Sequence, residues 1–199
     1  MAVMVVNRQR RATASPARLA RVAGRALAAL GRALGDVDVL VVDDAVIKRL
    51  NGRHRGVGRR TDVLAFPLQA PGSASPLVGQ IVISAETARR QARRLKVPLA
   101  TELDLLVTHG VLHLVGYDDR DPVEALLMHE REREILTAGR RQPPARLWQG
   151  LLDTPTPAGA SVSGHPRSTS GSRAPLQRSR IAPVSGHPRS TSGSRAPLQ

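Results

Sequence analysis

The chain contains no cysteine and very few lysines or aromatic residues. Without cysteine it can form neither disulfide bonds nor thiolate metal sites, which fits a reducing compartment. A single Phe, a single Tyr and a single Trp are too few for a row of aromatic platforms that stack on nucleic-acid bases. The apolar core must therefore consist mainly of Leu, Val, Ile and Ala.

The sequence also lacks a long apolar run near its start. Its first stretch, "MAVMVVNRQRRATASP", has about five apolar residues before its arginines, too few for a signal-peptide core or a membrane span. We therefore expect a cytoplasmic location and no membrane association.

Acidic residues are scarce relative to basic ones. The chain has 30 Lys and Arg against 16 Asp and Glu, a formal net charge of +14, and only Lys48 and Lys96 are lysines. Residues 1–139 hold 21 basic and 15 acidic residues, whereas residues 140–199 hold 9 arginines and one acid. An anionic partner such as RNA is compatible with this balance, and so is the arginine-rich composition that a GC-rich genome produces. Charge alone leaves nucleic-acid binding open.

Apolar periodicity and turn signals predict one domain over residues 1–139. Strands are expected at 2–7, 37–42, 61–67 and 78–84, and helices at 15–34, 43–56, 85–96, 101–115 and 122–137. The first helix has Ser15 as its N-cap, Pro16 at its first position and an apolar stripe that ends at Leu34. The arginines of the third helix either face RNA or form a solvated helix face.

The C-terminal part of the chain is rich in Pro, Ser, Gly and Arg. The 16-residue segment "VSGHPRSTSGSRAPLQ" occurs at 162–177 and again, letter for letter, at 184–199. Such a segment cannot bury enough apolar surface to offset the entropy of ordering. We therefore assign 140–199 to a basic tail that is disordered from about residue 150, and we discount His165 and His187 as ligands.

The stretch "THGVLHLVGYDD" at 108–119 places two histidines four residues apart on an expected helix. Residues i and i+4 share a helix face, so His109 and His113 can direct their imidazoles at one point. Gly116 allows the helix to end, and Asp119 can then supply a third ligand. The spacing H-x3-H-x2-G-x2-D therefore predicts a metal site of His109, His113 and Asp119.

Other assignments of these residues stay open. A histidine on a leucine-rich helix can instead be a hydrogen-bonded core residue. Asp118 could replace Asp119 as the ligand, with Asp119 facing solvent or capping the next helix. His129 is expected to be a surface histidine that could serve as a ligand in reserve, and His54, in a basic loop, is ambiguous.

The ligand spacing is shared with the metzincin peptidases, whose pattern is H-E-x-x-H-x-x-G-x-x-H. Their general-base glutamate would stand at position 110, which is glycine here, and their third histidine is replaced by Asp119. A metzincin-like metalloprotease is therefore an alternative that the spacing supports and the missing glutamate weakens.

Four stretches together resemble the YbeY family of metal-dependent endoribonucleases, known as rRNA maturation factors. "HGVLHLVGYDD" is similar to the family signature H-G-x-L-H-L-x-G-Y-D-H. "LNGRHRG" at 50–56, "TDVLAFP" at 61–67 and "GQIVIS" at 79–84 agree with the family in the right order. The resemblance covers roughly residues 1–139 and excludes the tail.

The resemblance implies a small α+β fold, in which a mixed sheet packs against helices, and a zinc ion bound by three side chains. It also implies cleavage of single-stranded RNA in 16S rRNA 3′-end maturation and ribosome quality control. The partners would be small-subunit rRNA and the ribosome or its proteins, and no specificity for DNA is expected.

Carried over by position, His109 and His113 are metal ligands and Arg55 is the functional arginine, so these three would be the catalytic residues. The third family histidine falls on Asp119. Two histidines with a carboxylate also form the ligand set that holds non-haem Fe²⁺, so zinc and iron both stay open.

Such a site could cleave a phosphodiester bond. The metal can polarise the phosphodiester and make water more acidic, while Arg55 binds the phosphate. Gly110 has no side chain to move protons, so the general base is unassigned. The attacking group, water or the 2′-hydroxyl of the RNA, is open as well. A noncatalytic ribosome-binding factor without metal is the remaining alternative.

Overall fold

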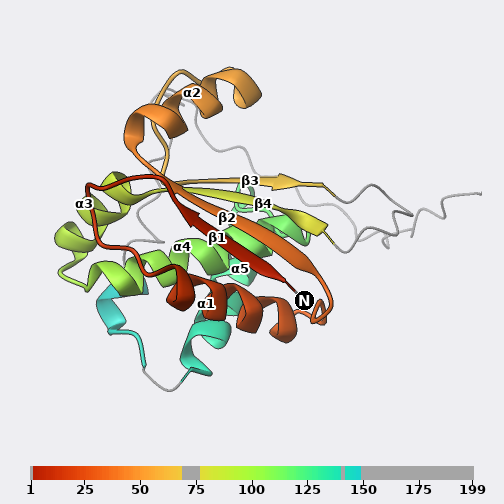
Figure 1. The fold of residues 1–199 in the computed structure, drawn as a ribbon. Coiled ribbons are helices and arrows are strands. Elements are labelled where there is room, and N and C mark those ends of the chain that lie inside the picture. The colour runs from red at the N-terminus through yellow and green to blue at the C-terminus, as the bar shows by residue number, and fades with distance from the viewer. Residues whose placement is uncertain (1, 69–76, 140–141, 149–199) are drawn as a thin grey trace, which may run out of the picture. The chain divides into compact units, whose positions relative to one another are not determined.

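The computed structural model describes residues 2–68, 77–139 and 142–148. Its centre is a four-stranded mixed sheet in the order β1-β2-β4-β3 (Figure 1). The parallel strands are β1 (Val3–Asn7), β2 (Asp36–Val42) and β4 (Leu77–Ser84), and β3 (Val63–Pro67) pairs antiparallel with β4. The expected α+β class with a mixed sheet is confirmed.

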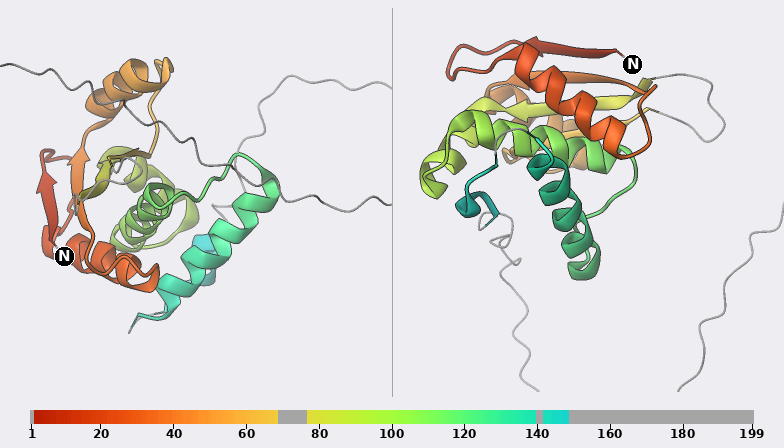
Figure 2. Two further views of the ribbon diagram at one scale, coloured as in Figure 1. Left: turned by 90° about the vertical axis from the view of Figure 1, so that its right-hand side faces the viewer. Right: turned by 90° about the horizontal axis from the view of Figure 1, so that it is seen from below.

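Five α-helices and one short 3-10 helix surround the sheet in the described ranges. They are α1 (Pro16–Ala29), α2 (Asp44–Arg55), α3 (Ala85–Leu95), α4 (Leu99–Leu114), α5 (Pro122–Thr137) and η1 (Ala145–Trp148). Figure 1 draws α2 above the strands and α1 below them. Helix α5 packs on the side of α4 that faces away from the sheet (Figure 2).

Strand β4 has buried side chains on both faces of the sheet, because alternate side chains of a strand point in opposite directions. On β4, Ile81 and Ile83 belong to the main core formed with α1 and α4. Val82, between them, belongs to a smaller core with Ile47 of α2. Helix α4 thus lies directly against the sheet, and its residues 109 and 113 are held on a rigid support.

Helix α1 begins as predicted but ends one turn early. The side chain of Ser15 accepts a hydrogen bond from the backbone N–H of Arg18 at 3.4 Å. The helix stops at Ala29, and Gly31 has a φ of +69°, a left-handed conformation that ends a helix. Leu34 is 84% exposed, so the prediction that the apolar stripe continues to Leu34 is wrong.

The described chain continues past the predicted domain boundary at residue 139. Leu147 of η1 is fully buried in the main core, and Trp148 packs against that core. The guanidinium of Arg133 lies 5.3 Å from the ring centroid of Trp148. The predicted disorder from about residue 150 lies outside the described residues. No helix in the described ranges is long and apolar enough to cross a bilayer.

Candidate metal centre

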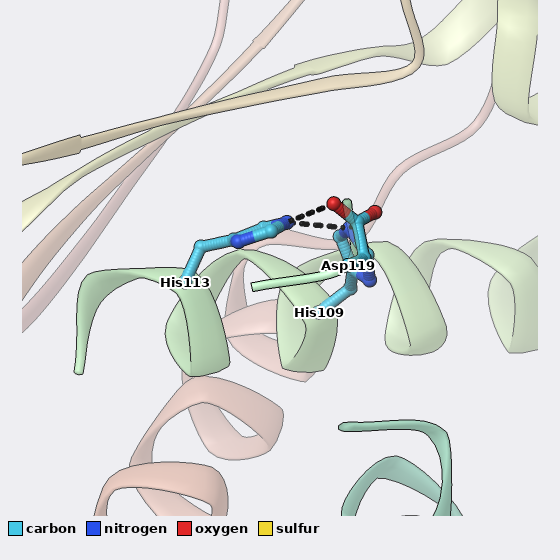
Figure 3. Close-up of side chains that lie close together, drawn as sticks. All are labelled: His109, His113 and Asp119. Carbon is cyan, nitrogen blue, oxygen red and sulfur yellow. Dashed lines mark hydrogen bonds and ion pairs between the residues drawn. The ribbon is translucent and has the colours of Figure 1, made fainter. Parts of the chain in front are cut away.

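The two histidines of α4 converge as their spacing predicts. The Nε2 atoms of His109 and His113 lie 2.9 Å apart, and their ring centroids are 4.5 Å apart (Figure 3). Asp119 completes the group, with Oδ2 3.6 Å from His109 Nε2 and Oδ1 3.8 Å from His113 Nε2. One ligand atom from each of the three residues lies within 4.8 Å of the others. We call His109, His113 and Asp119 the metal centre.

The turn after α4 brings Asp119 back to the histidines. Val115 caps the helix, and Gly116 has a φ of +101°, which strains any residue except glycine. The backbone N–H of Tyr117 then donates to the carbonyl of Leu112 at 3.1 Å, so the chain folds back along the helix end. Gly116 therefore allows the turn that brings Asp119 close to the two histidines.

Hydrogen bonds on the outer sides of the rings fix their tautomers. His109 donates from Nδ1 to Glu132 Oε1 at 2.7 Å. His113 donates from Nδ1 to the carbonyl oxygen of Tyr117 at 3.0 Å. With both Nδ1 atoms protonated, the neutral rings carry a lone pair on each Nε2, and both lone pairs point into the metal centre.

The size and chemistry of this group fit a metal ion. Ligand atoms at 2.0–2.1 Å from a tetrahedral zinc are about 3.4 Å apart, close to the separations among the three residues. Two facing nitrogen lone pairs and a carboxylate repel one another unless a cation or a proton lies between them. The metal centre can therefore hold a metal ion.

The charges around the histidines are set mainly by Glu132. Burial lowers the pKa of His109, but the hydrogen bond and charge of Glu132, with help from Asp119, outweigh burial and raise it. Burial and the neighbouring His109 lower the pKa of His113. Burial raises the pKa of Glu132, and the two histidines that it bonds, His109 and His129, lower it by more. Glu132 therefore remains an anion beside the metal centre.

Glu132 is the residue of this site that the sequence did not reveal. It is fully buried, and its second oxygen accepts from His129 Nδ1 at 3.0 Å. The only signal in the sequence was an acid three residues after His129 on a helix crowded with charges. The side chain of His129 is 16% exposed, so the prediction of a surface histidine is wrong.

Asp118 is not part of the candidate metal group. Its Oδ1 accepts from the backbone N–H of Asp119 at 2.9 Å, and its Oδ2 pairs with Arg120 Nε at 3.1 Å. Within the described ranges, the candidate metal group contains Asp119 and neither Asp118 nor His129.

Arg55 lies on the same groove as the metal centre. It is the exposed last residue of α2, and the groove, of about 620 Å³, is lined by Arg55, His113, Tyr117 and Asp119 among others. Its neighbour His54 packs edge-on against Phe66 at 4.9 Å between ring centroids, which assigns that ambiguous histidine to packing on β3. The structure thus places Arg55, His113 and Asp119 on one open groove, and the fourth predicted site residue, His109, contacts His113 through Nε2 at 2.9 Å.

Gly110 leaves no room for the side chain that a metzincin base would need. A Cβ at this position would lie 2.7 Å from Ile81 Cγ2, because α4 crosses β4 here. Real Cβ atoms essentially never approach so closely. The glycine is therefore required by helix–sheet packing, and this geometry counts against a metalloprotease.

Comparisons with known proteins identify one family over most of the described residues. A family model described as "Endoribonuclease YbeY" matches residues 4–139. A protein of that name from an Anaeromyxobacter species is 36% identical over 183 residues, 92% of this chain and 90% of its own length. Another, from Geobacter metallireducens, is 36% identical over 147 residues, 71% of this chain and 98% of its own length. The solution structure of a Thermotoga maritima protein aligns with 79% of this chain and 99% of its own, at 23% identity and a TM-score of 0.46.

Proposed function

The chain belongs to the YbeY endoribonuclease family, and from this premise we propose that it is a metal-dependent hydrolase that cleaves single-stranded RNA. The observation that carries the metal dependence is the convergence of two imidazole lone pairs and a carboxylate at 2.9–3.8 Å. Arg55 on the same groove supports a phosphate-containing substrate, because a guanidinium can bind two phosphate oxygens at once.

In the proposed mechanism, His109, His113 and Asp119 hold one metal ion per chain. The bound ion supplies a Lewis acid that polarises the phosphodiester and makes water more acidic. Glu132 keeps the Nδ1 proton on His109 and so keeps its Nε2 lone pair directed at the ion. Arg55 stabilises the negative charge that develops on the phosphate oxygens.

The metal we propose is zinc. Two imidazoles and a carboxylate form a common zinc ligand set that leaves a coordination position open for catalysis. The same three ligands also suit Fe²⁺, so the metal must be identified by measurement. Asp119 in place of a third histidine would make the centre one charge unit less positive, so a metal ion held there would be a weaker Lewis acid.

The substrate we propose within the cell is small-subunit rRNA. Two observations support this substrate. The chain belongs to the family whose members are known as rRNA maturation factors, and its net charge of +14 favours binding to polyanions. Processing of the 16S rRNA 3′ end, quality control on the ribosome and a cytoplasmic location follow from the same resemblance. We expect no specificity for DNA.

The decisive experiment begins with elemental analysis of the freshly purified full chain. The zinc-loaded protein is then incubated separately with unstructured RNA and with casein, with His113→Ala as the matched variant. We expect about one metal ion per chain, cleavage of RNA only, and loss of metal and cleavage in the variant. Casein cleavage would favour the metalloprotease, and a metal-free protein without cleavage would favour the noncatalytic ribosome-binding factor.

A further inference from the structure

A second cavity, of about 200 Å³, shares His109 and Asp119 with the metal centre. Its remaining walls come from the segment before β3, from α3, α4 and α5, and from η1. Glu102 of α4 lines this cavity together with the apolar side chains of Leu105, Leu106 and Leu147. We call this space the Glu102 cavity.

Glu102 is a buried acid, and one of its carboxylate oxygens lacks a hydrogen-bond partner among the described residues. Its side chain is 3% exposed, and its Oε2 atom is enclosed with no hydrogen-bond partner among the described residues. The Oε1 atom of Gln91 nearby is enclosed in the same way, while its Nε2 donates to Asp62 Oδ2 at 2.8 Å. Two buried acceptors therefore lack a donor, and a proton on Glu102 would supply one.

The surroundings favour that proton. Burial, with the nearby charge of Asp62, raises the pKa of Glu102 to about 7 against the opposing charge of Arg94. A carboxyl that changes charge close to neutral pH is suited to both accepting and releasing a proton during a reaction.

We propose that Glu102 is the proton-transfer residue of this hydrolase, exchanging protons with the reacting groups through the Glu102 cavity. The inference rests on the proposed function and deepens it. His109 and His113 have their nitrogens committed to the metal centre and its outer hydrogen bonds, and Gly110 has no side chain. Two acids outside the metal centre, Asp62 and Glu102, line the cavity; Asp62 Oδ2 accepts from Gln91, whereas Glu102 Oε2 has no partner among the described residues.

The step balances for hydrolysis of a phosphodiester. Oxygen of the attacking water forms a bond to phosphorus while the bond from phosphorus to the leaving ribose oxygen breaks. One proton of the water passes to the Glu102 carboxylate, and the same proton returns to the leaving oxygen. The carboxyl ends each cycle in the state in which it began.

Several charged and titratable groups face Glu102 and are relevant to any pH dependence. They are Asp62 before β3, Arg94 of α3, His109 of α4, Asp119 after it, and His129 of α5. From η1 only Leu147 lines the cavity, and it contributes burial without charge. Leu147→Ala should therefore hydrate Glu102 and lower its pKa without removing a titrating group.

The first test uses the metal-free protein. Carbon-13 NMR of the glutamate carboxyls, with Glu102→Gln to assign the resonance, should show Glu102 titrating near 7 and at lower pH in Leu147→Ala. Between its ordinary pKa and about 7 the folded state binds more protons than the unfolded state, so wild-type stability should fall as pH rises through that window. The Glu102→Gln variant should lack this fall, and an ordinary carboxyl pKa would overturn the proposal.

The second test measures single-turnover cleavage of one RNA by zinc-loaded proteins across pH. We expect Glu102→Gln to bind zinc within threefold of wild type, to cleave roughly a hundredfold more slowly, and to lose the acidic limb of the pH profile. Leu147→Ala should shift that limb toward lower pH by as much as its carboxyl pKa shifts. Glu130→Gln, an exposed acid of α5, is the matched control and should match wild type.

The outcomes separate the two proposals. A wild-type protein that cleaves no RNA refutes the hydrolase itself. A wild-type protein that cleaves RNA, with a Glu102→Gln variant of equal rate and unchanged pH profile, refutes the role of Glu102 alone. If Glu102→Gln does not fold, the carboxyl titration and the Leu147→Ala profile decide, and a limb that does not follow the carboxyl pKa overturns the proposal.

Discussion

The two histidines that we propose as ligands donate to acceptors of different strength. His109 donates to the buried carboxylate of Glu132, whereas His113 donates to the backbone carbonyl of Tyr117. A carboxylate partner makes an imidazole a stronger electron-pair donor than a neutral carbonyl does. His109 should therefore bind the metal more strongly than His113, although both occupy the same face of α4.

Asp119 is the residue in which this chain differs from the family signature, and its replacement is our first prediction. Asp119→Ala removes one of three ligand groups and should lose most bound metal, because the remaining imidazoles alone hold it weakly. Asp119→His should retain or strengthen binding, since it restores an imidazole at a ligand position. Elemental analysis after dialysis measures both.

Asp118→Ala is the matched control for this experiment. The side chain of Asp118 pairs with Arg120 outside the metal centre, so its removal should leave the metal content unchanged. Equal metal content in wild type and Asp119→Ala would contradict the assignment. Loss of metal in Asp118→Ala instead would transfer the role to Asp118.

Replacement of Glu132 is our second prediction. Glu132→Gln keeps the shape and an oxygen that can accept from His109 Nδ1, but it removes the buried charge. Zinc affinity should fall by about tenfold to a hundredfold, measured by competition with a chromophoric chelator. Glu134→Gln, on the exposed side of the same helix, should have wild-type affinity, and an unchanged affinity in Glu132→Gln would show that the charge is not used.

At the scale of elements, Asp44 joins the first turn of α2 to the end of β4 and to α3. Asp44 Oδ1 accepts from Ser84 Oγ at 2.6 Å and from Thr87 Oγ1 at 2.8 Å, and Oδ2 pairs with Arg90 at 2.8 Å. Burial raises the pKa of Asp44, but these partners outweigh it and lower the pKa to about 2. Its contribution to stability is complete above its ordinary pKa and is lost only as pH falls through about 2. The first turn of α2 is thereby fixed, and Arg55 at its other end is positioned on the groove.

Arg55 at the end of α2 is the subject of our third prediction. If its guanidinium binds the reacting phosphate, Arg55→Lys should be nearly as damaging as Arg55→Ala, because lysine lacks the planar pair of donors. Cleavage should slow by roughly a hundredfold, which corresponds to about 3 kcal/mol of transition-state stabilisation. Single-turnover cleavage of one RNA by folded, metal-loaded variants gives the comparison.

Arg53 is the control for Arg55, because it is exposed on the same turn of α2. Arg53→Ala should weaken RNA binding without slowing cleavage of bound RNA, and metal content should be the same in all three variants. A rate for Arg55→Ala within threefold of wild type would make Arg55 an ordinary surface arginine.

The elements themselves were predictable from local patterns. The periodicity of apolar residues indicates the strands and helices. N-cap residues such as Ser15 and Asp43 mark where helices begin, and their side chains accept hydrogen bonds from the first turns of α1 and α2. The convergence of His109, His113 and Asp119 was predictable for the same reason, since they are close in sequence and one helix period with one glycine turn brings them together.

The residues that sequence reasoning missed act through long-range contacts. Glu132 meets His109 only because α5 folds back onto α4, and Glu102 is set apart from other acids only by the burial around it. For Leu34 the error is the reverse, because the sequence pattern predicted a buried residue that is in fact exposed. The turn at Gly31 ends α1 before the apolar stripe ends. Periodicity describes one element at a time, whereas these three positions depend on how elements pack.

At the scale of the whole molecule, the described domain and the last fifty residues of sequence differ in what they can contribute. Leu147 fills the main core and closes the Glu102 cavity, so the residues just after 139 are part of the packing. Residues 150–199 contain six arginines and a single acid, Asp153, in a sequence too poor in apolar residues for a core of its own. We therefore expect residues up to about 150 to determine the stability of the protein, and residues 150–199 to add positive charge without adding stability.

Two truncations make this separation our fourth prediction. A chain that ends at Gly150 should keep the melting temperature and metal content of the full chain, because Leu147 and Trp148 remain. It should bind RNA less tightly at low salt and with a shallower salt dependence, because fewer cations meet phosphates. A chain that ends at Gly139 also loses the burial of Leu147, worth about 2–3 kcal/mol, and its melting temperature should fall by roughly 5–10 °C.

Calorimetry and RNA titrations at several salt concentrations measure these effects. A large fall in melting temperature already at Gly150 would show that the tail packs on the domain, whereas an unchanged Gly139 truncation would show that η1 contributes no stability and that burial by Leu147 cannot be what perturbs Glu102.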